Sequence, residues 1–304
     1  MSATDPTLPT ASDAAAIGLS EGPRKERLKD LAFKVAMLSC LAIALITLVA
    51  LVVQDAAKGV GSINLDFFTN YASSFPENAG IRAALLGTLW LMGVCALFII
   101  PVGVASAVYL EEYADRDRWY NRFIEVNIQN LASVPSIIYG ILGLAFLVRG
   151  PLALGRTVLA GGLTLALLVL PVVIIAGREA IRAVPPSIRE GSMALGATQW
   201  QTIWKQVLPA AIPGISTGVI LALSRAIGET APLILVGAPI FIAFDPTGLN
   251  SAFTVLPLQA FNWISQPQSE FKDLAAAAIL VLLAVLLVMN GVAIWLRNRY
   301  QQRW

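Results

Sequence analysis

Long apolar runs separated by short polar segments dominate this chain and set its expected architecture. The hydrocarbon core of a bilayer is about 30 Å thick, so a helix that crosses it needs about 20 predominantly apolar residues. Six runs reach that length, at about 31–53, 83–110, 126–148, 158–177, 212–236 and 274–296. The pattern therefore predicts an all-α, polytopic membrane protein with six transmembrane helices.

The composition supports this placement, because 57% of the 304 residues are hydrophobic and 13% are charged, against about 25% charged in soluble domains. We expect a mostly disordered tail at 1–30, a transmembrane domain at 31–297 and a short tail at 298–304. The chain has no histidine, and Cys40 and Cys95 lie inside apolar runs. Neither a metal centre nor a disulfide is therefore expected, which makes a membrane-embedded enzyme the least favoured class.

The distribution of basic residues predicts the orientation. Fifteen of the 21 lysines and arginines lie in the N-terminal segment, between spans two and three, between spans four and five, or after span six. The opposite segments contain five, namely Lys58, Arg82, Arg149, Arg156 and Lys272. The positive-inside rule then places both termini and the 187–209 segment in the cytoplasm.

The 187–209 segment has the pattern of two short helices between two apolar spans. Ser187 and Thr198 each start a capping-box pattern, with Glu and Gln three residues later. Gly196 is suited to end the first helix in a left-handed turn, and the second helix is expected to run to about 207, where Leu208 and Pro209 would stop it. On this local pattern alone, the segment could equally be a passive connector at the membrane surface.

The fifth span contains an arginine and a glutamate. Arg225 is expected near its middle, where a charge costs at least ~2.5–3.5 kcal/mol to insert, and Glu229 follows four residues later on the same helix face. The two could simply neutralise each other, or they could form a functional site in which the guanidinium contacts an anion. The small residues Gly214, Gly218, Ala222 and Ala226 form a ridge suited to close helix packing.

Several of these segments resemble a known family. Glu190, Gly196, Ile203, Leu208 and Pro209 resemble the EAA loop of permease subunits in bacterial ABC importers, with Gly191 and Ser192 where that family has two alanines. The runs S-R-A-I-G-E-T-A-P from Ser224, F-T-V-L-P-L-Q-A-F-N-W-I-S from Phe253, E-E-Y-A from Glu111 and V-P-S-I-I-Y-G from Val134 resemble the PstA-type permeases of phosphate importers. The resemblance covers the chain from about residue 80, which we take as the start of the core (80–297).

The resemblance implies a type I ABC importer permease fold and two functional regions. It implies that the loop docks on a cytoplasmic ATPase through Glu190, Gly191, Ser192, Met193, Ala194, Gly196, Ile203, Leu208 and Pro209. It implies that the substrate pathway includes Arg225, Glu229 and Thr230. The implied partners are a PstC-like permease subunit, two PstB-like ATPase subunits, a periplasmic phosphate-binding protein, inorganic phosphate and the lipids of the inner membrane, with no nucleic acid.

Other functions stay open on the sequence. The chain has no G-x-x-x-x-G-K-[ST] motif, so we expect it to bind no cofactor itself and ATP to be bound by the partner. A sister PstC-type permease, or a permease for another oxyanion, is the nearest alternative. An ion-coupled secondary transporter is less favoured, because spans one to three contain no counterpart of the Arg225–Glu229 pair.

Overall fold

The computed structural model describes residues 24–115, 117–239 and 241–300, and within them it contains helices and connections but no strand. Most of the predicted N-terminal tail, and residues 301–304 of the C-terminal tail, lie outside the described residues. Residues 24–30, which the pattern assigns to the tail, form the first turns of a helix. The chain divides into two compact units, residues 1–53 and 54–304.

The described part of the first unit is a single long helix. Helix α2 (Arg24–Gly59) carries the first predicted span, and every side chain from 28 to 53 is exposed. Because its apolar side chains surround the whole circumference, α2 is suited to a lipid or protein environment and not to water. It is one of five described helices that are long and apolar enough to cross a membrane.

The second unit is built from helices of very different length. The long ones are α4 (Arg82–Val108), α7 (Val158–Arg182), α10 (Leu208–Gly228) and α13 (Ser269–Tyr300). The short ones are α3 (Leu65–Thr69), α5 (Trp119–Ala132), α6 (Ser136–Leu142), α8 (Pro186–Ala194), α9 (Gln199–Thr202), α11 (Ala231–Val236) and α12 (Leu256–Ile264). Two 3₁₀ turns, Val60–Ser62 and Pro76–Asn78, and three π-helical turns, Tyr109–Tyr113, Gly143–Val148 and Ile203–Val207, complete it.

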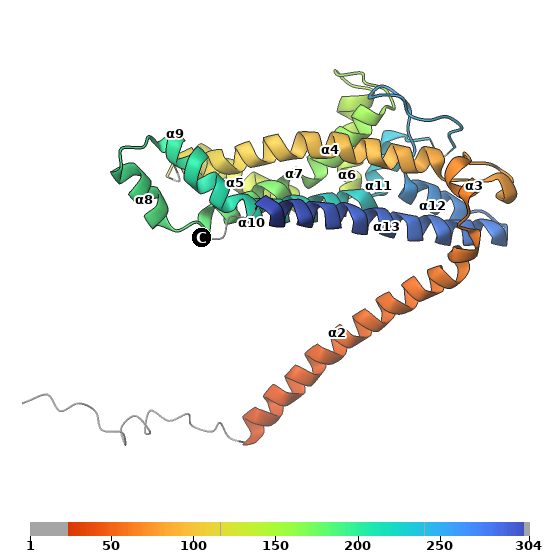
Figure 1. Cartoon of the computed structure of the whole chain (residues 1–304), viewed down its shortest axis with the longest axis horizontal. Coiled ribbons are helices and arrows are strands. Elements are labelled where there is room, and N and C mark those ends of the chain that lie inside the picture. Colours follow the sequence, from red (N-terminus) through yellow and green to blue (C-terminus); the bar gives the residue numbers. More distant parts are fainter. Residues whose placement is uncertain (1–23, 116, 240, 301–304) are drawn as a thin grey trace, which may run out of the picture. The chain divides into compact units, whose positions relative to one another are not determined.

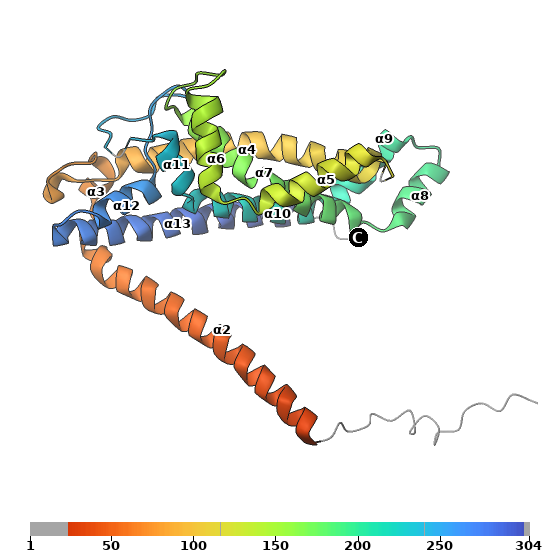
Figure 2. The same ribbon diagram turned by 180° about the vertical axis from the view of Figure 1, so that it is seen from behind.

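The four long helices run side by side (Figures 1 and 2). Helix α7 is central in the bundle. In its most apolar stretch of 18 residues 67% are buried, against 39% or less in the same stretch of the other candidate spans. The predicted small-residue ridge lies on its contact with α10, because a Cβ atom at Gly214 would lie 2.6 Å from Ala180 Cβ and one at Gly218 would collide with Ala176. Glycine at these positions lets the two backbones approach closely.

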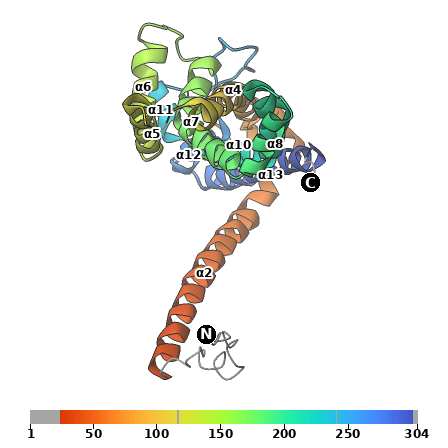
Figure 3. The ribbon, with the colours of Figure 1, turned by 90° about the vertical axis from the view of Figure 1, so that its left-hand side faces the viewer.

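The two ends of this bundle are built differently. A hairpin of α8 and α9 projects from one end, which faces the viewer in Figure 3, and α3 and α12 lie at the other end. There Phe67, Trp263 and Phe271 pack together with ring centroids 6.1 and 6.5 Å apart. The connection from α11 to α12 is attached by Asp245, which accepts hydrogen bonds of 2.6–3.1 Å from Arg82 at the start of α4.

Two predicted spans differ from the structure. The third was expected to be one helix over 126–148, but α5 and α6 are bent by 109° across residues 133–135. Pro135 lacks an N–H and disfavours helical backbone at the residue before it, which accounts for the break. The fifth was expected to continue to 236, but α10 ends at Gly228 and α11 begins at Ala231. The described residues thus provide five straight candidate spans and one broken pair.

Candidate functional site

The hairpin formed by α8 and α9 is shaped by the signals expected from its sequence, with one exception. Gly196 has φ +86°, and hydrogen bonds from Gly196 N to Met193 O and from Ala197 N to Ser192 O form a Schellman motif that ends α8. Thr198 and Gln201 form the predicted capping box before α9. The capping box expected at Ser187 is absent, because α8 starts at Pro186 and Ser187 therefore lies inside its first turn.

The predicted coupling residues of α8 are mostly at the surface. Glu190, Gly191, Met193 and Ala194 are exposed, as is Gly196. Ser192 is half-buried, and its Oγ lies 2.9 Å from the Oγ1 of Thr202, which joins α8 to α9. The exposed face continues at the tip with Leu195, which is 92% exposed.

The second helix does not stop at Leu208 and Pro209 as predicted. It passes from α9 through the π-helical turn Ile203–Val207 directly into α10, and both residues lie in the first turn of α10. A proline inside a helix clashes with the carbonyl four residues earlier, and the wider π turn, closed by Leu208 N to Ile203 O, accommodates it. Ile203 is buried, and the hairpin is continuous with a membrane helix.

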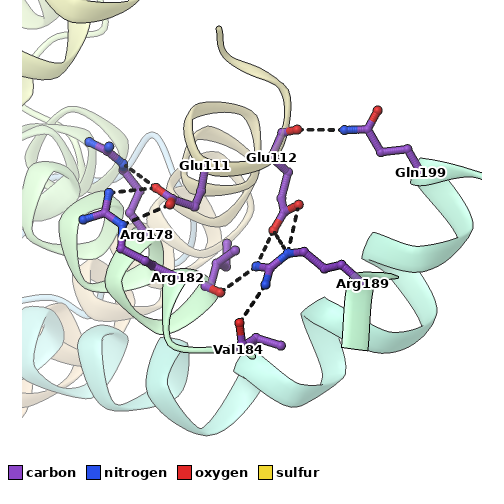
Figure 4. Close-up of polar contacts among 8 residues, drawn as sticks. Glu111, Glu112, Arg178, Arg182, Val184, Arg189 and Gln199 are labelled. Carbon is purple, nitrogen blue, oxygen red and sulfur yellow. Dashed lines mark hydrogen bonds and ion pairs between the residues drawn. The ribbon is translucent and has the colours of Figure 1, made fainter. Parts of the chain in front are cut away.

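Two glutamates in the π-helical turn Tyr109–Tyr113, directly after α4, connect the helices at the end of the bundle that carries the hairpin (Figure 4). The Glu111 carboxylate is 5% exposed and accepts two 3.0 Å hydrogen bonds from Arg182. Arg178 Nε lies 3.6 Å from the same carboxylate, and Arg178 Nη2 lies 2.9 Å from Glu125 Oε1 on α5. Burying a carboxylate is costly unless cations and hydrogen bonds compensate it, and two arginines of α7 do so here.

Glu112 makes equivalent contacts with the hairpin. Its carboxylate accepts hydrogen bonds of 2.7 Å and 3.1 Å from Arg189 of α8, and its backbone oxygen accepts one of 2.8 Å from Gln199 of α9. Arg189 also donates to the backbone oxygens of Val184 and Ile181, at 2.7 Å and 2.9 Å. The Val184 oxygen lies just past the end of α7, and the Ile181 oxygen in its last turn also accepts a 3.2 Å hydrogen bond from Val184 N.

Arg225 and Glu229 are paired, but their setting differs from the prediction. Arg225 lies in the last turn of α10, about 24 Å along the helix from Pro209, and not near the middle of the helix. Glu229 has left the helix, with φ −76° and ψ 120°, and accepts a 3.3 Å hydrogen bond from Arg225 Nε. The Arg225 side chain is 44% exposed and that of Glu229 18%. A cation at a helix C-terminus is favoured by the helix dipole.

The segment after this pair packs against the bent third span. Thr230 precedes α11 and is half-buried, and its backbone oxygen accepts from Leu233 and Ile234. A Cβ atom at Gly140 of α6 would lie 2.6 Å from the Cα of Pro232, so α6 and α11 touch through their backbones. Tyr139 in turn donates 2.9 Å to the Leu131 oxygen across the bend. The sequence runs from Val134 and from Ser224 are therefore neighbours in space.

Several residues of these two regions were missed from the sequence. Sequence reasoning counted Glu112, Arg178 and Arg189 only as charges or as part of a motif, because the Arg189–Glu112 contact joins residues 77 positions apart and no local pattern specifies it. Ser224 Oγ donates 2.7 Å to Asn290 Oδ1 on α13, one residue before Arg225. An asparagine inside an apolar span could have indicated this contact.

Three sequence relatives cover between 75% and 90% of the chain. The "Probable ABC transporter permease protein YqgI" of Bacillus subtilis is 33% identical, covering 84% of this chain and 91% of the relative. The "Phosphate transport system permease protein PstA 1" of Mycobacterium tuberculosis is 34% identical, covering 90% of this chain and 89% of the relative. The PstA protein of Haemophilus influenzae is 34% identical, covering 75% and 80%.

Solved structures share the fold at lower identity. A chain of a bacterial alginate ABC transporter aligns with a TM-score of 0.68 and 19% identity, covering 92% of this chain and 98% of that one. A chain of the MetNI methionine ABC transporter in an inward-facing conformation aligns with a TM-score of 0.60 and 18% identity, covering 73% and 96%. At such identities the likeness concerns the fold, which is that of an ABC importer permease as expected.

One family model matches residues 99–304. This region contains the hairpin, the helix turn with Arg225, and the whole of α10 and α13. With that match and the relatives above, the chain belongs to the binding-protein-dependent transport system inner membrane component family.

Proposed function

We propose that this chain is a PstA-type permease subunit of an ATP-driven importer for inorganic phosphate, in which it forms half of the translocation pathway. The observation that carries the proposal is the Arg225–Glu229 pair, in a chain whose relatives include phosphate transport system permeases. Arg225 lies in the last turn of a candidate span with Glu229 directly after it, and Arg225 is too exposed to be a structural element of this chain's own core.

The geometry of the pair suits transient contact with an anion. Among the described residues, the Arg225 guanidinium makes one hydrogen bond, through Nε, at a distance of 3.3 Å. The N–H groups on its two Nη atoms can therefore bind phosphate oxygens as a fork. Glu229 would hold the arginine when the path is empty and release it to the anion, and Thr230 would line the same turn. Conduction needs weak binding, so that the anion leaves as well as enters.

The proposal includes partners and an orientation. A PstC-like permease would complete the pathway beside the exposed Arg225, two PstB-like ATPase subunits would bind ATP and contact the hairpin, and a periplasmic phosphate-binding protein would deliver the ion. This chain would bind no cofactor and catalyse no reaction. Both termini and the hairpin would be cytoplasmic, as the positive-inside distribution suggests, and ATP-driven closure of the ATPase would move Glu190–Pro209 and switch the access of the pathway.

The test is uptake of labelled phosphate at low external concentration in cells that lack this chain. We expect the wild-type chain to restore uptake and Arg225→Gln to reduce it about 10- to 100-fold, the effect of losing charge-assisted hydrogen bonds worth ~1.5–3 kcal/mol. Arg225→Lys retains the charge without the fork and should fall between the two. The matched control is Arg118→Gln, because Arg118 is exposed and its side chain contacts only Asp115 among the described residues.

Membrane levels of each variant are measured by immunoblot, so that lost uptake is separated from lost protein. Full uptake by Arg225→Gln would show that Arg225 is not part of the pathway, without contradicting phosphate as the transported ion. Equal phosphate uptake with and without the chain would remove phosphate as the cargo, and the same cells would then be assayed with labelled sulfate as an alternative oxyanion.

A further inference from the structure

Helix α8 is attached to the rest of the chain almost entirely through polar contacts. It buries no side chain completely, and Ile188 is its half-buried apolar contact with the cluster around Ile181 and Val184. Apolar packing therefore holds α8 only weakly. An element that receives force from a partner subunit but is loosely packed would tilt or slide before it moved the membrane helices.

Arg189 provides the attachment that packing does not. Its guanidinium binds the Glu112 carboxylate through two nitrogens, at 2.7 Å and 3.1 Å, and binds two backbone oxygens at the end of α7. Arg189 is 21% exposed and Glu112 is 9% exposed, so water competes little for these bonds. Because the planar guanidinium is bound both by the carboxylate and by the backbone oxygens, it resists rotation of α8 as well as its separation from α7.

The second helix of the hairpin, α9, also binds Glu112. Gln199, the first residue of α9, donates its side-chain N–H to the backbone oxygen of Glu112 at 2.8 Å. Glu112 thus has one contact from each hairpin helix, from opposite sides of the residue, as Figure 4 shows. The neighbouring Glu111 independently joins α4 to α7 through Arg182 and Arg178. The hairpin therefore contacts two helices, α4 and α7, that are already connected to each other.

We infer that Arg189 and Glu112, supported by Gln199, are positioning residues that transmit displacement of the hairpin to α4 and α7, so that these helices move with it as one body. This inference rests on the proposed function, because it assumes that a partner ATPase displaces the hairpin. The continuous α9–α10 helix moves α10 through the backbone, and residues 183–185 join α7 to α8. Helix α4 has no direct chain connection to the hairpin, and its end contacts the hairpin through Glu112.

The first experiment measures the rigid connection without reference to the cargo. Spin labels are placed on Ser187→Cys in α8 and Leu97→Cys in α4, both exposed positions, with Cys40 and Cys95 replaced by alanine, in the assembled transporter. We expect the distance distribution to be the same with and without ATP in the otherwise wild-type chain, and to broaden and shift with ATP in Arg189→Ala. A shift with ATP while Arg189 and Glu112 are intact would overturn the inference.

The second experiment measures coupling in proteoliposomes, as labelled phosphate imported per ATP hydrolysed. We expect that ratio to fall about tenfold or more in Arg189→Ala, because the variant loses the charge-assisted hydrogen bonds to Glu112 and to two backbone oxygens. Glu112→Gln, which retains the shape and loses the charge, should fall less, and Arg189→Lys should recover part of the loss. Arg118→Ala is the control, since it removes a cytoplasmic arginine without breaking a contact between helices.

The two experiments separate the inference from the proposed function. If Arg189→Ala and Glu112→Gln lower uptake and hydrolysis in equal proportion, with an unchanged ratio, the contact serves assembly and not coupling, and the inference is wrong. If the wild-type vesicles import no phosphate but the spin-label result is as expected, the proposed cargo fails while the rigid connection stands.

Discussion

Gly87 is where α4 touches the segment that leads into α12. A Cβ atom there would collide with the backbone oxygen of Thr254, which cannot move away as a flexible side chain could. We expect Gly87→Ala to lower the free energy of unfolding by about 1–3 kcal/mol through overpacking, measured as a lower thermal midpoint in detergent. On the same helix, Gly93 is exposed with open space around it, so Gly93→Ala should leave the midpoint unchanged or raise it. Equal midpoints for the two variants would contradict the close approach.

Residue identity predicted that Arg225 and Glu229 form a pair, but it did not predict where along the helix the pair lies. The i, i+4 spacing of Arg225 and Glu229 indicated a pair, and the pair is present. The spacing could not show that the helix ends between them, because Gly228 only permits such a break and the neighbours that stabilise it, such as Gly140 beside Pro232, are distant in sequence. The actual setting, a helix terminus with an exposed guanidinium, came only from the structure.

At the level of elements, the Arg82–Asp245 contact holds the long connection between α11 and α12 against α4. Arg82 binds Asp245 through two nitrogens and lies over the Tyr71 ring at 5.4 Å from its centroid. We expect Asp245→Asn to speed amide hydrogen exchange in residues 241–255 about two- to fivefold, a modest effect because the pair is partly exposed. The exposed Glu77, as Glu77→Gln, is the control. Unchanged exchange in 241–255 would mean that this connection is held by other contacts.

The hairpin was predictable where its signals are local. Gly196 and the Thr198 capping box act within four residues, and both are found as expected. The continuation past Pro209 was not predictable, because it depends on a π-helical turn whose stability comes from the burial of Ile203 and Val207. The bend in the third span is an intermediate case: Pro135 indicated a disturbance, but its size of 109° depends on packing against α11 and α7.

For the whole molecule, the orientation across the membrane is the prediction that most needs a direct measurement. Single cysteines are introduced at Leu195, in the hairpin, and at Phe75, between α3 and α4 at the other end, in a chain with alanine at positions 40 and 95. Both positions are strongly exposed, at 92% and 70%. A membrane-impermeant maleimide should label position 195 only in inverted vesicles and position 75 only in right-side-out vesicles. Labelling of both from the same side would refute the six-span arrangement.

The all-α fold and five of the six predicted spans followed from apolar run length alone, because a bilayer imposes a minimum length on any helix that crosses it, whereas the third predicted span is a bent pair of helices. The arrangement of the spans did not follow, because their apolar surfaces carry little directional information. The small-residue ridge was the exception, since glycines at a spacing of four favour one helix face for close packing, and that face does meet α7. The ion pairs at the bundle end join segments 71 and 77 residues apart, which no local pattern specifies.

The π-helical turn between α9 and α10 also constrains how the gene for this chain can vary. A π turn already contains one residue more than an α turn, so inserting a further residue in Ile203–Val207 could not be absorbed there and would rotate α9 by about 100° about the axis of α10. Gln199 would then face away from the residue that it now binds. Substitutions at the exposed Trp204 and Lys205 preserve that register. This short stretch should therefore accept changes of residue type far more readily than an insertion.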